Sequence, residues 1–155
     1  MKYLIVWFFI AMCISDIKAQ EKEFIRDNFP GMGSRFNKAL HAYLLGNSLF
    51  NEGENSYYLA KIAYLEAYSF NPNHALLNFN IGICYLKTAD KLKAKTFFNN
   101  AFLLNFRINP KINYYFGVCF QLESQWDSAM NYYKIYEANL DKLAQREEWI
   151  LTEKR

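Results

Sequence analysis

Glycine recurs at nearly regular intervals along this chain, and the interval constrains the fold more than any other feature of the sequence. Gly46, Gly82 and Gly117 are 36 and 35 residues apart. Helical repeats of about 34 residues, each a helix–turn–helix hairpin, place small residues at fixed positions so that two backbones can approach. One such hairpin cannot bury its apolar face alone, so hairpins stack on their neighbours. The spacing therefore predicts a stack of helical hairpins.

A second set of small residues follows the glycines in the same order. Ala60, Ala94 and Ala129 are 34 and 35 residues apart. Four positions after each alanine an aromatic residue follows, and three positions further on stand two alanines and a tyrosine: Tyr64, Phe98 and Tyr133, then Ala67, Ala101 and Tyr136. We expect the glycines and alanines to form the helix contacts of each hairpin, with the aromatic rings filling the space beside them.

The turn signals divide the chain into segments. We expect a leading segment over 20–34, made of a short helix over Glu21–Asn28 and a linker, then three repeats over 35–141 and a C-terminal segment over 142–155. The repeats have boundaries at 35–73, 74–109 and 110–141, where Pro72 and Pro110 mark the breaks. Residues 142–155 are rich in charge and are expected to form a capping helix, or the start of an incomplete fourth repeat.

Residues 1–19 have the pattern of a secretory signal peptide. Lys2 precedes an apolar run from Tyr3 to Ile14, and Ala19 offers a small residue before a cut at Gln20. The run is short for a helix that spans a bilayer, which needs about 20 apolar residues. Two alternatives stay open: the segment is retained as an anchor, or Cys13 is lipidated, although Ile10-Ala11-Met12 is a poor lipobox. Membrane association is expected only in those two cases.

The sequence contains little that indicates catalysis or cofactor binding. His41 and His74 have no second ligand at metal-binding spacing, so both are expected at the surface and no metal site is predicted. Glycine-rich phosphate loops and paired-carboxylate motifs are absent from the sequence, which argues against an enzyme and against a cofactor. The net charge of +3 is too small to indicate a nucleic-acid partner.

Cys84 and Cys119, each two positions after its glycine, are expected to be buried thiols without a disulfide.

The repeated residues resemble the tetratricopeptide repeat (TPR). Its first helix is matched by Leu45-Gly46, by Ile81-Gly82 with Tyr85, and by Phe116-Gly117 with Phe120, and its second helix by the alanine–aromatic pairs. The TPR tryptophan is replaced by Ala42, Asn78 and Asn113. This resemblance implies an all-α, TPR-like helical solenoid of three hairpins, with a leading helix and a C-terminal capping helix.

TPR solenoids bind partners on a concave face lined by the first helix of each hairpin, so the resemblance also implies a site. Carried onto this chain, the groove consists of Tyr43, Asn47, Phe50, Phe79, Asn80, Ile83, Lys111, Tyr114 and Tyr115. Its centre is expected at Phe79, Ile83 and Tyr114, exposed to a protein or peptide partner. Asn47, Asn80 and Lys111 match positions that carboxylate-binding TPR domains use. Tyr43 and Tyr115 replace the other lysine and the arginine, so carboxylate recognition is a minor alternative.

A narrower resemblance concerns the setting. The stretch AYSFNPNHALLNFNIGICYL is similar to the N-terminal repeats of periplasmic proteins from Bacteroidetes, some of them linked to type IX secretion and gliding motility. In those proteins the repeats precede a β-propeller and an OmpA-like domain, to which nothing in this sequence corresponds. The resemblance implies an exported, periplasmic or envelope-associated scaffold or adaptor. The alternative is a structural N-terminal fragment of a longer envelope protein, with its groove filled by its own chain.

Overall fold

The structure, a computed structural model, describes residues 20–153. The predicted signal peptide and Cys13 lie outside these residues. The described part contains six α-helices and no strands, so the prediction of an all-α fold is confirmed. The helices are α2 (Gly33–Asn51), α3 (Tyr57–Phe70), α4 (Ala75–Leu86), α5 (Ala94–Leu104), α6 (Ile112–Leu122) and α7 (Trp126–Glu153). None of them is both long enough and apolar enough to cross a bilayer.

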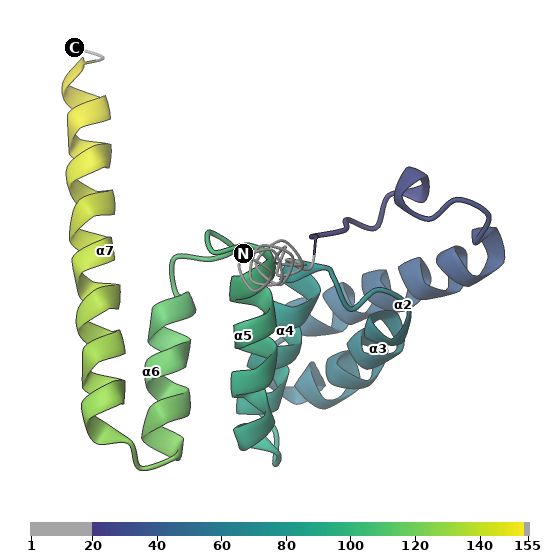
Figure 1. Cartoon of the computed structure of the whole chain (residues 1–155), viewed down its shortest axis with the longest axis horizontal. Coiled ribbons are helices and arrows are strands. Elements are labelled where there is room, and N and C mark those ends of the chain that lie inside the picture. The colour runs from purple at the N-terminus through teal and green to yellow at the C-terminus, as the bar shows by residue number, and fades with distance from the viewer. Residues whose placement is uncertain (1–19, 154–155) are drawn as a thin grey trace, which may run out of the picture.

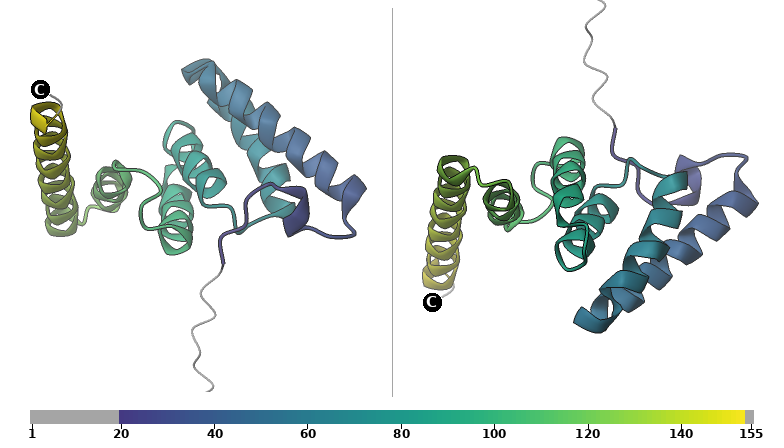
Figure 2. Two further views of the ribbon diagram at one scale, coloured as in Figure 1. Left: turned by 90° about the horizontal axis from the view of Figure 1, so that it is seen from above. Right: turned by 90° about the horizontal axis from the view of Figure 1, so that it is seen from below.

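Consecutive helices pair into three hairpins. Helix α2 packs on α3, α4 on α5, and α6 on α7, while α3 contacts α4 and α5 contacts α6. The hairpins therefore follow one another in chain order, with α7 at one end of the molecule and α2 and α3 at the other (Figure 1). Seen from above and below, α2 and α3 are inclined to the helices that follow (Figure 2).

The repeated glycines lie where the two helices of each hairpin are closest. A Cβ atom on Gly82 would lie only 2.7 Å from Cε1 of Phe98. In the same way, a Cβ on Gly46 would overlap the ring of Tyr64, and one on Gly117 the ring of Tyr133. Real Cβ atoms do not approach neighbours so closely, so each ring occupies the space that glycine leaves free.

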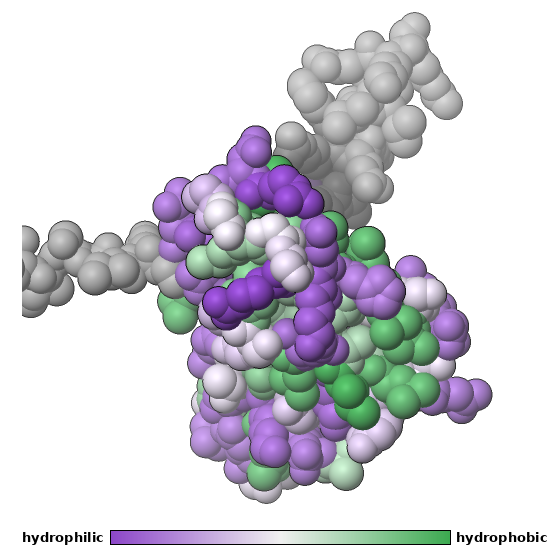
Figure 3. Space-filling model, turned by 90° about the vertical axis from the view of Figure 1, so that its right-hand side faces the viewer, coloured by the Kyte–Doolittle hydropathy of each residue, from purple (hydrophilic) through white to green (hydrophobic). Residues whose placement is uncertain are grey.

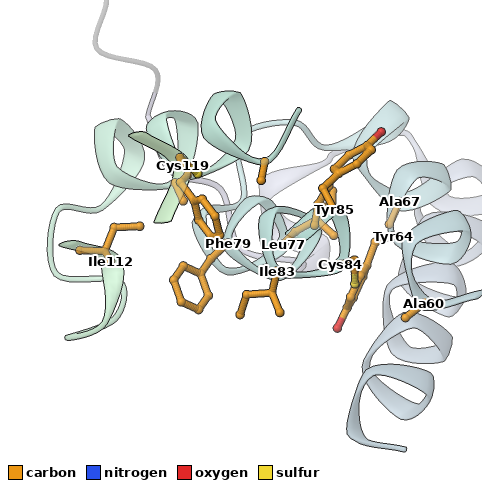
Figure 4. Close-up of a cluster of buried hydrophobic side chains, with 14 of the residues drawn as sticks. Ala60, Tyr64, Ala67, Leu77, Phe79, Ile83, Cys84, Tyr85, Ile112 and Cys119 are labelled. Carbon is orange, nitrogen blue, oxygen red and sulfur yellow. The ribbon is translucent and has the colours of Figure 1, made fainter. Parts of the chain in front are cut away.

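The core runs through the stack and is centred on α4. Leu77 and Cys84 of α4 are fully buried, and Figure 4 shows them between Tyr64 of α3 and Cys119 of α6. Ala60, Ala94 and Ala129, the repeated alanines, are all buried as well. Helix α4 is buried on most of its surface because it has a hairpin neighbour on both sides.

The leading segment is not the helix expected over Glu21–Asn28. Only a single 3₁₀ turn, η1 (Arg26–Asn28), forms there, and the backbone at Ile25 is extended. Hydrogen bonds to the α3–α4 turn hold the preceding residues: the Lys22 N–H donates to the Asn73 carbonyl at 2.7 Å, and Asn71 Nδ2 donates to the Lys22 carbonyl at 2.7 Å. A short isolated helix is marginal in water, so these tertiary hydrogen bonds prevail.

The C-terminal segment also differs from the expectation. No separate capping helix begins at residue 142, because α7 continues without interruption from Trp126 to Glu153 and extends past the end of α6 (Figure 1). The sequence between these residues contains neither proline nor glycine, so nothing in it breaks the helix.

Candidate functional site

The candidate site is a surface formed mainly by one side of α4 and α6, where two hollows adjoin at Tyr115. The central hollow has a volume of about 560 Å³ and the second hollow about 500 Å³. Tyr115 lines both of them. This is the side of the first helices on which the groove was expected.

The central hollow is lined by four helices and one loop, with Tyr115 as the contribution of α6. Phe50 contributes from α2, several residues from α4, and Tyr136 and Leu140 from α7, while Asn109 and Pro110 precede α6. The α4 residues are Leu76, Phe79, Asn80 and Ile83. Apart from Lys111, every lining residue is uncharged, so the walls are apolar and aromatic with a single cation at the edge.

The second hollow lies beside the first, between the C-terminal end of α4 and the face of α6. Its walls are Leu86 and four residues of α6, namely Tyr114, Tyr115, Val118 and Leu122. Lys87 and Lys91 are its charged lining residues. Lys87 Nζ lies 3.4 Å from Glu54 Oε1, an exposed contact that contributes little stability. Both hollows thus combine apolar walls with lysine at the margin.

The expected centre of the groove is only partly exposed. Phe79 is 3% and Ile83 9% exposed, so the expectation that these two side chains face solvent is wrong. The reason is packing by two rings: that of Tyr115, from the next hairpin, lies 5.5 Å from the Phe79 ring, and that of Phe98, from α5 of the same hairpin, lies 5.7 Å from it. Tyr114, at 41% exposed, is open to solvent as expected. Phe79 and Ile83 therefore form the floor of the central hollow.

The side chains of Asn47 and Asn80 both form hydrogen bonds with the hydroxyl of Tyr64. The hydroxyl of Tyr64 donates to Asn47 Oδ1 at 2.8 Å, and Asn80 Nδ2 donates to that hydroxyl at 3.1 Å. Burial raises the pKa of Tyr64 well above its ordinary value, so the hydroxyl keeps its proton. Two of the three groups that would hold a carboxylate are thus engaged inside the fold, and only Lys111 remains exposed.

The part of the groove expected on the first hairpin is covered by the chain itself. The ring of Phe24, from the leading segment, stacks on Tyr43 with 4.8 Å between ring centres. Burial raises the pKa of the Tyr43 hydroxyl. The open surface is accordingly limited to Phe50 of α2 and to the residues of α4, α6 and α7.

His74 is not a surface residue, contrary to the sequence-based expectation. Only 2% exposed, it caps α4: its Nδ1 accepts from the Leu77 N–H at 3.0 Å. Its Nε2 therefore carries the proton and donates to Glu23 Oε2 at 2.9 Å. The ring of Phe24 also packs against it. His74 thus ties the leading segment to the start of α4.

Sequence reasoning missed two residues of the site on α7. Tyr136 and Leu140 line the central hollow from the last hairpin. A signal for Tyr136 existed, because it stands where the other hairpins have the fully buried Ala67 and Ala101. A tyrosine cannot fit where alanine is buried between helices, so this break in the pattern marks a side chain with open space beside it.

The two cysteines of the described chain are free and buried, which confirms that prediction. Burial raises the pKa of each thiol to about 12. Their thiolates are therefore scarce near neutral pH, and neither residue is poised to act as a nucleophile. Among residues 20–153, no three side chains of the types His, Cys, Asp and Glu come together in a group able to hold a metal ion.

Comparisons of this chain with protein-family models, with curated proteins and with solved structures find no match.

Proposed function

We propose that this chain is a TPR-like helical solenoid that works as a non-catalytic protein-binding module, with a peptide or helix of its partner seated over the two hollows. The regular sequence period and the three paired hairpins support the solenoid assignment. The observation that carries the binding proposal is the pair of adjoining hollows on α4 and α6, with apolar and aromatic walls. Interface cores favour such residues, because they bury large area at low entropic cost.

The charges around the hollows define the chemistry of the partner. Lys87, Lys91 and Lys111 are the charged lining residues, and neither hollow is lined by an acidic one. A complementary segment has apolar side chains to fill the hollows and at least one acidic group near a lysine. Opposite charges at the rim accelerate encounter and suppress wrong partners more than they add affinity.

The setting proposed for this module is the bacterial envelope, where it acts as a scaffold or adaptor after export. Support comes from the signal-peptide pattern of residues 1–19 and from the resemblance of the repeats to periplasmic proteins. A role in secretion or gliding belongs to the same proposal.

A second candidate is a structural segment whose groove is filled by its own chain. Phe24 favours it, because this residue already covers Tyr43 on the first hairpin. The hollows of the second and third hairpins distinguish the two candidates, since in residues 20–153 no segment fills them.

The test is a selection of binding peptides from a random library on the purified chain, followed by affinity measurements with substituted proteins. The binding module predicts enriched peptides with large apolar residues and an acidic residue. Tyr114→Ala should weaken their binding at least tenfold, while Leu103→Ala on the outer side of α5 should leave it unchanged; both side chains are exposed. If the selection enriches no peptide, or if Leu103→Ala weakens binding as much as Tyr114→Ala, the hollows are not a binding site.

A further inference from the structure

In its first helix, the first hairpin leaves exposed a residue whose equivalents in the second and third hairpins are buried. By the repeat spacing, Leu45 in α2 corresponds to Ile81 in α4 and Phe116 in α6. Ile81 is 0% and Phe116 4% exposed, because each has a preceding hairpin packed against its helix, whereas Leu45 is 46% exposed. Leu59 and Ile62 of α3 are exposed as well. Figure 3 views this side of the molecule and shows hydrophobic residues gathered on it.

Two exposed apolar residues of α3, Leu59 and Ile62, stand at positions where the second hairpin has polar residues. In the second hairpin the equivalent positions are held by Lys93, just before α5, and by Thr96 of α5, and both suit a surface in contact with water. We call the apolar surface formed by Leu45, Leu49, Leu59 and Ile62 the head face. Exposed apolar residues that cluster in this way mark interaction surfaces.

The two junctions between hairpins share one kind of contact, a lysine of one hairpin over an aromatic ring of the next. At the first junction, Lys61 Nζ of α3 lies 4.9 Å from the ring centre of Tyr85 in α4. At the second junction, Lys95 Nζ of α5 lies 3.8 Å from the ring centre of Phe120 in α6. A lysine of one hairpin therefore covers an aromatic ring of the next hairpin at both junctions.

In the first and the last hairpin of the described residues, the positions of this contact are held by other residue types. Leu49 of α2 stands where Tyr85 and Phe120 stand, and Met130 of α7 stands where the lysines stand. Met130 is 56% exposed, and Trp126, one turn earlier, is also exposed. We call the surface formed by Trp126 and Met130 the tail face. Methionine packs readily against irregular apolar surfaces, so Met130 and Leu49 form a complementary pair without a charge to bury.

We propose that copies of this chain stack head to tail, with the tail face of one copy on the head face of the next, as a continuation of the junctions inside the chain. The helices that carry the two faces, α2 and α3 for the head face and α7 for the tail face, lie at opposite ends of the molecule (Figure 1). Each contact therefore leaves one face free at either end of the assembly, so the stack grows with concentration and has no fixed size. Further along α7, Glu137 replaces the phenylalanine of α5, Phe102, so the contact is centred on the first turns of α7.

The test blocks each face separately and then mixes the two variants. Met130→Glu disables the tail face and Leu45→Glu the head face; both sites are exposed, so both variants should fold. The purified chain, with its N-terminus established by intact mass, is studied by sedimentation velocity over a wide concentration range. The unsubstituted chain should form progressively larger species, each variant alone should remain monomeric, and their equimolar mixture should stop at the dimer. Circular dichroism confirms that both variants are folded.

Each other outcome overturns the proposal. An unsubstituted chain that is monomeric at every concentration shows that its ends do not bind each other. If Met130→Glu alone still dimerises, the contact is between two head faces, and if Leu45→Glu alone does so, it is between two tail faces. Should a glutamate variant unfold, Met130→Cys and Leu49→Cys replace the pair. With a mild oxidant added to accept the two electrons, head-to-tail stacking requires a disulfide between the two when they are mixed and none within either sample, since the native Cys84 and Cys119 are buried.

Discussion

At the residue scale, each hairpin depends on an aromatic ring that fills the space beside a glycine. The rings of Tyr64, Phe98 and Tyr133 lie where a glycine Cβ would otherwise be. These rings come from the second helix of each hairpin and the glycines from the first, so every contact joins the two helices. The close approach depends on the missing Cβ, and a larger side chain at the glycine must displace the ring.

Gly82 offers the sharpest test of this packing. Gly82→Leu should lower the free energy of unfolding by about 1–3 kcal/mol, because the new side chain meets the buried ring of Phe98. Gly33→Ala is the control, since its Cβ would make an ordinary contact at 3.5 Å with Arg26. Urea denaturation measures both. A loss of equal size in the two variants would mean that the ring contact does not hold the helices together.

Phe79 and Tyr114 occupy equivalent positions in α4 and α6 but differ in burial. Phe79→Ala should cost about 3–5 kcal/mol, because it removes a buried ring packed on Phe98 and Tyr115. Tyr114→Ala removes a half-exposed ring and should cost less than half as much. The midpoints of chemical denaturation compare them. Equal losses would show that Tyr114 belongs to the core and is not available to a partner.

The two buried thiols predict how stability depends on pH in the alkaline range. The pKa of Cys84 and of Cys119 is about 12 in the folded chain, against an ordinary value of 9.0. Between these values the unfolded thiols lose their protons while the folded ones keep them. The contribution of these thiols to the free energy of unfolding is therefore fully present below pH 9 and is lost as the pH rises toward 12. Replacing both cysteines with alanine should flatten this fall, as followed by thermal unfolding at a series of pH values. An unchanged slope would show that other groups cause it.

Residue patterns alone anticipated the packing at the three glycines and the burial of both cysteines. They could not anticipate that Phe79 is buried while its equivalent Tyr114 is exposed. The difference comes from neighbours: Phe79 has a following hairpin, whose Tyr115 covers it, whereas Tyr114 belongs to the last hairpin of the described chain. Periodicity identifies the face on which a residue lies, but the burial of that face depends on position in the stack.

At the scale of elements, the start of α4 is organised by a contact that is remote in sequence. His74 caps the helix with one ring nitrogen and holds Glu23 of the leading segment with the other. The sequence suggested an isolated surface histidine and a helix over Glu21–Asn28. Both expectations failed for one reason, because the leading segment docks through hydrogen bonds that no local pattern shows. The sequence also suggested a helix boundary at residue 142. No helix-breaking residue stands there, and α7 continues through this position.

Substitutions at His74 separate its two contacts. His74→Asn can still cap α4 but loses the contact with Glu23, whereas His74→Ala loses both. We expect the alanine variant to be less stable than the asparagine variant by about 0.5–2 kcal/mol, the usual value of an N-cap. Thermal unfolding of the two variants decides this. If they have the same stability, the ring nitrogen that faces Leu77 contributes nothing to the helix start.

At the scale of the whole molecule, the hairpins place α4 and α6 side by side with an apolar surface open beside them. The sequence identified the helices that form this surface, because the repeat register fixes which side of each first helix is shared. It did not identify Tyr136 and Leu140, which enter from α7, or the covering of Tyr43 by Phe24. These two features depend on how α7 and the leading segment pack on the hairpins. The repeat pattern does not predict that packing, because the leading segment lies outside the repeats and α7 departs from their pattern at Tyr136.

The most direct measurement is a map of amide chemical-shift changes when a selected peptide is titrated into the isotopically labelled chain. The central claim is that a partner segment lies over the two hollows. It predicts the largest shifts in Leu76–Lys87, in Lys111–Leu122 and around Tyr136, with the outer side of α5 unaffected. Shifts confined to α3 and α5, or to the head face on the first hairpin, would contradict it, because the peptide would then bind elsewhere and leave the hollows empty.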